Sequence, residues 1–208
     1  MNGQAHWECI YAGRPATEVS WYEVDPSVSL QLIERANVDR SMPVIDIGGG
    51  ASVLVDALHR EGYGDITVLD LSRTALDVAR KRLGNSASAV RWLEGDVLCV
   101  ELPPAHYALW HDRAVFHFLT SPADRQQYVN RVVEATLADS HVVIATFALD
   151  GPPRCSGLDV ARYSAADLQT TLGEQFTLVH YQRHEHRTPS GGVQPFTYCL
   201  FRRKRHGA

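Results

Sequence analysis

From residue 43 onward, short apolar runs rich in β-branched residues alternate with segments of helical periodicity. The apolar runs lie at residues 44–47, 66–71, 90–94, 107–111 and 141–147. The helical segments lie at residues 51–59, 73–83, 122–138 and 164–172. This alternation is typical of βα units built around a mainly parallel sheet. We therefore predict an α/β fold with a doubly wound sheet.

The last two predicted strands, at residues 176–183 and 196–203, break this alternation. A turn-forming segment at residues 188–192, which contains Gly and Pro, joins them. Strands joined by a turn rather than by a crossover helix pair antiparallel. The sheet is therefore predicted to have seven strands, to be mainly parallel and to end in an antiparallel hairpin.

Residues 1–40 precede the first strand and contain an amphipathic segment at residues 28–36. We predict that they form a short N-terminal helical cap on an α/β core made by residues 41–208. A single hydrophobic core can grow to this length, and no long polar linker divides the sequence. The whole chain, residues 1–208, is therefore predicted to be one domain.

The composition narrows the class of protein further. With 20 Lys+Arg against 24 Asp+Glu, the net charge of −4 argues against a nucleic-acid partner. No apolar run approaches the roughly 20 residues needed to span a bilayer, so no membrane segment is expected. The four cysteines form no C-x-x-C pair, which predicts free thiols, no metal site and a cytoplasmic location. A monomer and a homodimer both remain possible.

The sharpest motif is the glycine cluster Gly48, Gly49 and Gly50, which follows Asp46 between the first strand and the first helix of the core. Glycine there lets the backbone approach a ligand closely and presents N–H groups at a helix N-terminus. A tight strand-to-helix turn also needs glycine without binding anything. The cluster alone therefore leaves a purely structural role open.

Two further acids follow neighbouring strands. Asp70, with Leu71, ends the second strand, and Asp96, with Val97, lies just past the third. In a doubly wound sheet, an acid at the carboxyl end of a strand accepts hydrogen bonds from ribose hydroxyls. Asp70 alone could instead cap the next helix. Together with the glycine cluster, the acids predict a slot shaped for adenosine.

At these residues the sequence resembles the class I S-adenosylmethionine-dependent methyltransferases, over about residues 40–203. The resemblance implies a Rossmann-like methyltransferase fold with S-adenosylmethionine as the cofactor. It also implies that the loop from Asp46 to Gly50 lies under the methionine and ribose, that Asp70 binds the ribose, and that Asp96 and Val97 contact the adenine. The sequence departs from the family pattern at Ser52, where a third glycine is common.

The competing interpretation is an NAD-binding domain. Its G-x-G-x-x-G motif requires a glycine at the position that Val53 occupies here. The chain also leaves no room for a separate substrate domain beyond the final hairpin. Both observations favour the methyltransferase.

The candidate catalytic residues, His111, Asp112 and Arg113, lie at the carboxyl end of the fourth strand. Ligands of open α/β sheets bind outside the carboxyl ends of the strands, so these side chains are expected beside the methyl acceptor. We predict His111 or Asp112 as the base that deprotonates it. A structural, salt-bridged corner is the alternative. The absence of an N/D-P-P-Y motif argues against a DNA base or glutamine as the acceptor.

Three further segments are expected to contact the substrate. Residues 150–163 follow the fifth strand and are predicted to be a lid or, alternatively, a Pro-rich surface turn. The candidate substrate-binding residues are Arg154, Cys155 and Tyr163 in this loop, His117 after the fourth strand, and Trp21 and Tyr22 in the cap. An anionic acceptor would suit Arg154.

The sequence thus predicts an S-adenosylmethionine-dependent methyltransferase that acts on a small molecule. A protein lysine methyltransferase is the second hypothesis, because the acidic balance suits a cationic side chain. The third hypothesis is a protein that binds the cofactor without catalysis.

Overall fold

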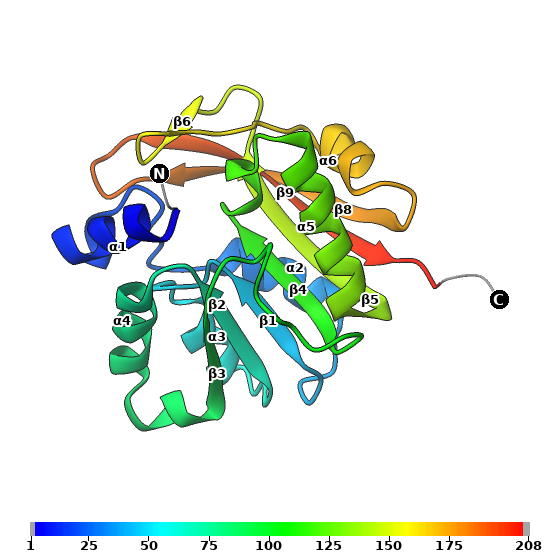
Figure 1. Cartoon of the computed structure of the whole chain (residues 1–208), viewed down its shortest axis with the longest axis horizontal. Coiled ribbons are helices and arrows are strands. Elements are labelled where there is room, and N and C mark those ends of the chain that lie inside the picture. The colour runs from blue at the N-terminus through cyan, green and yellow to red at the C-terminus, as the bar shows by residue number, and fades with distance from the viewer. Residues whose placement is uncertain (1–2, 206–208) are drawn as a thin grey trace.

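The computed structural model describes residues 3–205 and contains a seven-stranded sheet with the strand order β3-β2-β1-β4-β5-β9-β8 (Figure 1). The strands are β1 (Val44–Ile47), β2 (Ile66–Asp70), β3 (Val90–Glu94), β4 (Tyr107–Arg113), β5 (Thr136–Phe147), β8 (Phe176–Arg187) and β9 (Val193–Arg203). Strands β1 to β5 pair in parallel, and β9 pairs antiparallel with both β5 and β8. The predicted fold, including its terminal antiparallel hairpin, is confirmed.

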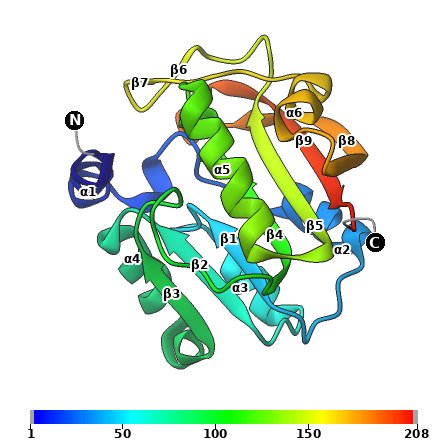
Figure 2. The same ribbon diagram turned by 45° about the vertical axis from the view of Figure 1, so that its right-hand side comes forward.

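Helices cover both faces of the sheet, as Figure 2 shows for α5 and α6 on the near face. The helices are α1 (Gly3–Gly13), α2 (Ser27–Ala36), α3 (Leu54–Arg60), α4 (Arg73–Leu83), α5 (Pro122–Ala135) and α6 (Ala165–Leu172), with single-turn or short 3-10 helices η1 (Ala16–Glu18), η2 (Gly84–Ala89) and η3 (Phe116–Phe118). Alternate residues of β1 belong to different cores: Val44 packs with α2 to α4, and Ile45 with α5 and α6. All four residues of β1 are therefore buried, as expected for a strand covered on both faces.

The register brings the predicted site residues to one edge of the sheet. Ile47, the last residue of β1, pairs with Leu69 of β2 and with Asp112 of β4. The glycine loop therefore begins between the ends of its two neighbouring strands. Helix α1 lies beside α4 at this edge, where the Glu8 carboxylate accepts a hydrogen bond of 2.6 Å from the Thr74 hydroxyl (Figure 1).

Several boundaries differ from the prediction. The first core helix begins at Leu54 rather than at residue 51, because positive φ angles at Gly48 (67°) and Gly50 (25°) keep the preceding residues in a loop. Helix α5 ends at Ala135 rather than at residue 138, and the residues after it belong to β5. The loop at residues 150–163 contains a small hairpin of β6 (Arg154–Cys155) and β7 (Leu158–Asp159).

The N-terminal cap is more helical than the sequence indicated, because α1 precedes the expected amphipathic helix. Residues 1–2 of the predicted cap lie outside the described residues. Within residues 3–205, no helix combines the length and apolar character that crossing a membrane requires. All four cysteines are free thiols, as predicted.

Candidate active site

The glycine loop is packed so tightly that side chains have no room. A Cβ atom at Gly48 would lie 2.1 Å from Cγ2 of Val115, and one at Gly50 would lie 2.5 Å from Oδ2 of Asp70. Both residues also have positive φ angles, which L-residues with a Cβ rarely adopt. The Gly48 amide donates to the Leu69 carbonyl at 2.7 Å. The loop is thereby fixed against the ends of β2 and β4.

A cavity opens above this loop at the carboxyl ends of the strands. One end, which we call the Asp70 end, is formed by Asp70, Leu71, Gly95, Asp96 and Val97. The other, the Arg113 end, is formed by Arg113, Ala114, Val115, Phe118, Leu119 and Cys155. Ile47, Gly48 and Leu69 form the floor between them. The cavity thus joins three predicted cofactor-binding segments to the segment after β4.

Asp70 is a buried acid with few donors around it. Its Oδ1 accepts a hydrogen bond of 2.8 Å from the Ser72 amide. Burial raises the pKa of Asp70 to about 7, and the nearby Asp46 carboxylate adds to this, although the Ser72 and Gly50 amides act in the opposite direction. Donors from a bound ligand would stabilise the ionised form. Asp96 is exposed and its Oδ1 accepts from the Leu98 amide at 2.9 Å.

A second cavity adjoins the first, and the two share several lining residues, among them Gly48. It includes Asp46, Gly49, Ser52 and His111, and it shares Arg113 with the first cavity. Oδ1 of Asp46 lies 2.7 Å from Nδ1 of His111. Oδ2 of Asp46 is buried and has no hydrogen-bond partner among the described residues.

These features fit S-adenosylmethionine. An unpartnered buried carboxylate oxygen on Asp46 suits the ammonium group of a methionine. The Asp70 carboxylate has few hydrogen-bond donors around it and therefore suits ribose hydroxyls. It lies at the end of β2, where doubly wound folds bind the ribose. Gly50 is not in the lining of either cavity; it supports Asp70 from behind.

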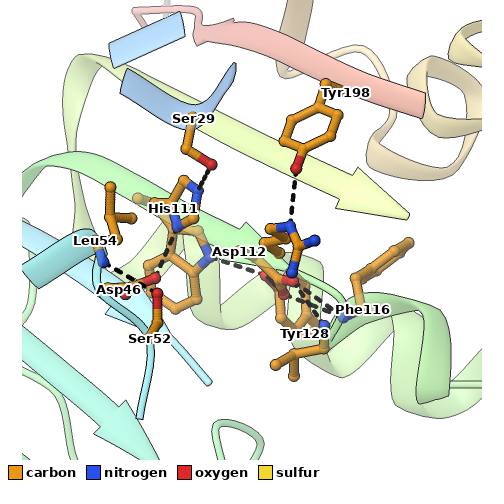
Figure 3. Close-up of polar contacts among 12 residues, drawn as sticks. Ser29, Asp46, Ser52, Leu54, His111, Asp112, Phe116, Tyr128 and Tyr198 are labelled. Atoms are coloured by element: carbon orange, nitrogen blue, oxygen red, sulfur yellow. Dashed lines mark hydrogen bonds and ion pairs between the residues drawn. The ribbon is translucent and has the colours of Figure 1, made fainter. Parts of the chain in front are cut away.

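His111 is held between two side chains rather than free to act on an acceptor. Its Nδ1 faces Asp46, and its Nε2 lies 2.9 Å from the Ser29 hydroxyl of α2 (Figure 3). The ring is 3% exposed. Because both nitrogens are occupied, His111 orients Asp46 at the wall of the second cavity.

Asp112 has a structural role. It is fully buried, and its carboxylate accepts hydrogen bonds from the amides of Val115 and Phe116 and, at 2.5 Å, from the Tyr128 hydroxyl (Figure 3). Burial raises its pKa to about 6, while these donors lower it. Asp112 therefore stabilises the turn after β4 and lines neither cavity, which fits the alternative of a structural corner better than the predicted role as a base.

Arg113, the last residue of β4, extends toward β9. Its Nε donates to the Tyr198 hydroxyl of β9 at 2.8 Å, and its Nη1 donates to the Trp21 carbonyl at 2.9 Å. Nη2 lies 2.8 Å from Oε1 of Glu23. Burial lowers the pKa of Arg113, but the Tyr198 and Glu23 groups raise it above its usual value. The guanidinium is therefore a fixed positive charge.

Aromatic side chains from the N-terminal segment cover the first cavity. Trp7 and Tyr11 of α1 line it together with Trp21, and Trp7 packs edge-to-face on both Trp21 and Phe118. The Trp21 indole N–H donates to the Tyr11 hydroxyl at 3.1 Å. Burial raises the pKa of Tyr11, so its hydroxyl stays neutral. This cover shields the cavity from water.

The predicted substrate residues divide into three groups. Trp21 and Cys155 line the first cavity and Tyr22 the second, and burial raises the pKa of the Cys155 thiol to about 11. Arg154, by contrast, is exposed and pairs with Asp159 at 2.7 Å.

Two other candidates are buried behind the site. The described residues that line the two cavities do not include His117 or Tyr163. Burial lowers the pKa of His117 to about 3, and the ring packs between Phe118 and Phe147. Both side chains belong to the packing beneath η3 rather than to the cavity wall.

Sequence reasoning missed several cavity residues. They are Trp7, Tyr11, Ser29 and Phe118. Trp7 and Tyr11 are four residues apart, a spacing that places both on one helix face, and this signal was present in the sequence. Nothing local marked Ser29, whose partner His111 lies far along the chain. Within residues 3–205, no group of three or more His, Cys, Asp or Glu side chains is arranged to hold a metal ion.

Comparison with solved structures agrees with this architecture. A methyltransferase from Anabaena variabilis, described as S-adenosylmethionine-dependent, shares 15% identity, with 98% of this chain and 96% of that chain covered and a TM-score of 0.73. The Burkholderia thailandensis 1,6-didemethyltoxoflavin-N1-methyltransferase, solved with S-adenosylhomocysteine, shares 21% over 86% and 78%, with a TM-score of 0.68. The [4+2]-cyclase SpnF shares 12% over 97% and 92%, with a TM-score of 0.71. At these identities the likeness establishes the fold.

The sequence of the core also matches a known family model. Residues 44–137, which run from β1 into the start of β5, match a family model described as a methyltransferase domain. No curated protein matches the chain significantly. The fold is the Rossmann-like methyltransferase fold, and the family match supports the predicted resemblance to the class I S-adenosylmethionine-dependent methyltransferases. S-adenosylmethionine, the predicted cofactor, is the cofactor of that family.

Proposed function

We propose that the chain transfers a methyl group from S-adenosylmethionine to a small molecule. The observation that carries this proposal is the continuous cavity, which has strand-end acids at its Asp70 end and a fixed cation under an aromatic cover at its Arg113 end. The cofactor would place its adenosine against Asp70 and Asp96 and its methionine in the second cavity. The Arg113 end is then left for the acceptor.

The bound cofactor supplies an electrophilic methyl group on a sulfonium. The chain's residues hold and orient it: Asp46 receives the ammonium, Asp70 the ribose hydroxyls, and the glycine loop allows the close approach of both. The aromatic cover from Trp7 and Trp21 excludes water from an in-line displacement, which depends chiefly on alignment.

Two features favour a small acceptor over a lysine side chain. The N-terminal segment covers the cavity, which leaves no broad groove for a polypeptide. At the Arg113 end, the Glu23 carboxylate is already paired with Arg113 at 2.8 Å, so it is less available to an ammonium group. The didemethyltoxoflavin enzyme shows that a protein of this fold can act on a small molecule.

Methyl-labelled S-adenosylmethionine tests the proposal directly. The protein is incubated with the label and, in separate reactions, with a metabolite extract or with denatured cell proteins. Label in small molecules supports the proposal, and label in polypeptide supports the lysine hypothesis. Binding of S-adenosylhomocysteine without any transfer identifies a protein that binds the cofactor without catalysis.

A further inference from the structure

Arg113 is the only positively charged side chain among the described residues that line the first cavity. The rest of the Arg113 end is apolar or neutral: Ala114, Val115, Phe118, Leu119 and Cys155. A single buried charge in apolar surroundings selects strongly for a ligand of opposite charge, because it is poorly screened there. The Arg113 end therefore favours an anion attached to an apolar body.

The guanidinium is held in place by groups other than its anionic partner. Tyr198 and the Trp21 carbonyl take the Nε and Nη1 donors, and the Phe196 ring lies beneath the group at 4.8 Å. Nη2 is buried and forms an ion pair with Oε1 of Glu23 at 2.8 Å. The guanidinium is therefore fixed in position, and one of its donors already faces a carboxylate.

Glu23 holds the carboxylate near this donor. It comes from the segment between η1 and α2, and its Oε1 also accepts from the Tyr198 hydroxyl at 3.4 Å and lies 3.7 Å from Nδ1 of His186. Its neighbours would keep it in place without an optimal bond to Arg113. An incoming carboxylate can therefore replace it as the partner of Nη2.

No base at the Arg113 end is suited to deprotonating an acceptor. Asp112 accepts three donors behind the wall, and His117 is buried outside the lining. The Cys155 thiol, with a pKa of about 11, stays protonated. An acceptor that is ionised in water near neutral pH needs no base, and carboxylic acids, with pKa values of about 4, meet this condition.

From these observations we propose that the acceptor is the carboxylate of a small apolar or aromatic acid, and that Arg113 determines this specificity. The inference rests on the proposed function. A carboxylate oxygen forms the new bond to the methyl carbon, the methyl–sulfur bond breaks, and its electron pair remains on sulfur as a neutral thioether. The product is a methyl ester, and no proton is transferred.

The linkage of the transferred methyl group tests this inference. Methyl-labelled S-adenosylmethionine is incubated with the protein and either an acidic small-molecule extract or benzoate, phenylacetate, indole-3-acetate and hexanoate, with their primary amides as neutral controls. Methyl esters release methanol in mild alkali, whereas N-, S- and aryl-O-methyl groups do not. We expect alkali-labile label with acids and none with amides.

Each other outcome has a distinct meaning. Label that survives alkali overturns the carboxylate inference and leaves the proposed function standing. Absence of label from every reaction contradicts both, and S-adenosylhomocysteine binding in the same samples shows whether the cofactor site is intact.

Two variants with opposite expected effects identify the residues. With the best acid, Arg113→Gln should raise KM about tenfold or more, since a charge-assisted bond is lost, while changing the Kd of S-adenosylhomocysteine less than about threefold. Glu23→Gln removes the competing carboxylate and should lower KM. Arg202→Gln on β9, which breaks an exposed ion pair with Asp139 of β5, is the matched control and should leave KM unchanged.

An equal loss of S-adenosylhomocysteine affinity in Arg113→Gln would assign Arg113 to the cofactor's own carboxylate and overturn the inference. If that variant does not fold, Glu23→Gln still decides, because an unchanged or raised KM contradicts the competition between the two carboxylates.

Discussion

The Asp70 end of the cavity comes from the consecutive strands β2 and β3, whereas the Arg113 end is assembled from β4, η3, β6 and the N-terminal segment. At the Asp70 end, each functional acid follows its own strand by at most two residues. At the Arg113 end, the central guanidinium contacts Tyr198 and Trp21, which lie 85 and 92 positions away along the chain.

The difference separates two kinds of function. Under the proposed function, the cofactor binds to a short local motif that the parallel register brings together. The acceptor binds where distant segments meet, so this end can change without altering the motif. Five predictions test this comparison.

The largest effect is expected at the glycine loop. Gly48→Ala should weaken S-adenosylhomocysteine binding about a hundredfold, because the new Cβ collides with Val115 in a backbone conformation that already disfavours it. Calorimetry measures this. Gly62→Ala is the matched control: its φ is also positive, at 88°, but nothing lies within 4 Å of the added Cβ. Equal behaviour of the two variants would show that the close approach is unimportant.

Asp70→Asn should weaken binding of S-adenosylhomocysteine by about 1–3 kcal/mol, since a charged hydrogen-bond acceptor is lost. The exposed Asp77, on α4, provides the control Asp77→Asn, which should have no effect.

For the parent protein, the affinity for S-adenosylhomocysteine should fall as pH drops below about 7, because binding requires ionised Asp70. An affinity independent of pH between 5 and 8 would contradict this role.

The same pKa fixes the sign of the stability effect. In the ligand-free fold Asp70 binds its proton more tightly than in the unfolded chain, so its contribution to stability is lost as pH rises from about 4 to about 7. At pH 8 without ligand, Asp70→Asn should therefore be more stable than the parent in thermal unfolding. Lower stability would show that the carboxylate is well stabilised in the free protein.

Asp112→Asn tests whether Asp112, next to Arg113 in β4, stabilises the fold or takes part in catalysis. The variant should lose about 1–2 kcal/mol of unfolding free energy, because an amide group faces the N–H donors of Val115 and Phe116. Denaturant unfolding measures this loss. Turnover per folded molecule should change little. A large fall in turnover with unchanged stability would instead restore Asp112 as a catalytic residue.

The smallest effect is expected at Arg154. Its ion pair with Asp159 is largely exposed on both sides, with side chains 67% and 72% accessible. Arg154→Ala should change stability by less than about 0.5 kcal/mol and leave acceptor kinetics unaltered. A changed preference among acceptors would show that this loop contributes to acceptor binding.

The sequence by itself determined the sheet and the Asp70 end. Apolar runs that alternate with helical segments specify parallel strands, and parallel strands bring their carboxyl ends to one edge whatever the details of packing. Asp46, Asp70 and Asp96 could therefore be placed near one another from strand boundaries alone. The boundaries of β1 and β3 agree with those predicted, which is why this reasoning succeeded.

Only the tertiary structure decided the roles of the residues after β4. His111, Asp112 and Arg113 are consecutive, yet one orients Asp46, one stabilises a turn, and one faces the cavity. Successive residues of a strand point to opposite faces, and what each meets depends on segments remote in sequence, here Ser29, Tyr128 and Glu23. The pattern of residue types carries no information about those partners, because burial and pairing are properties of the packed chain.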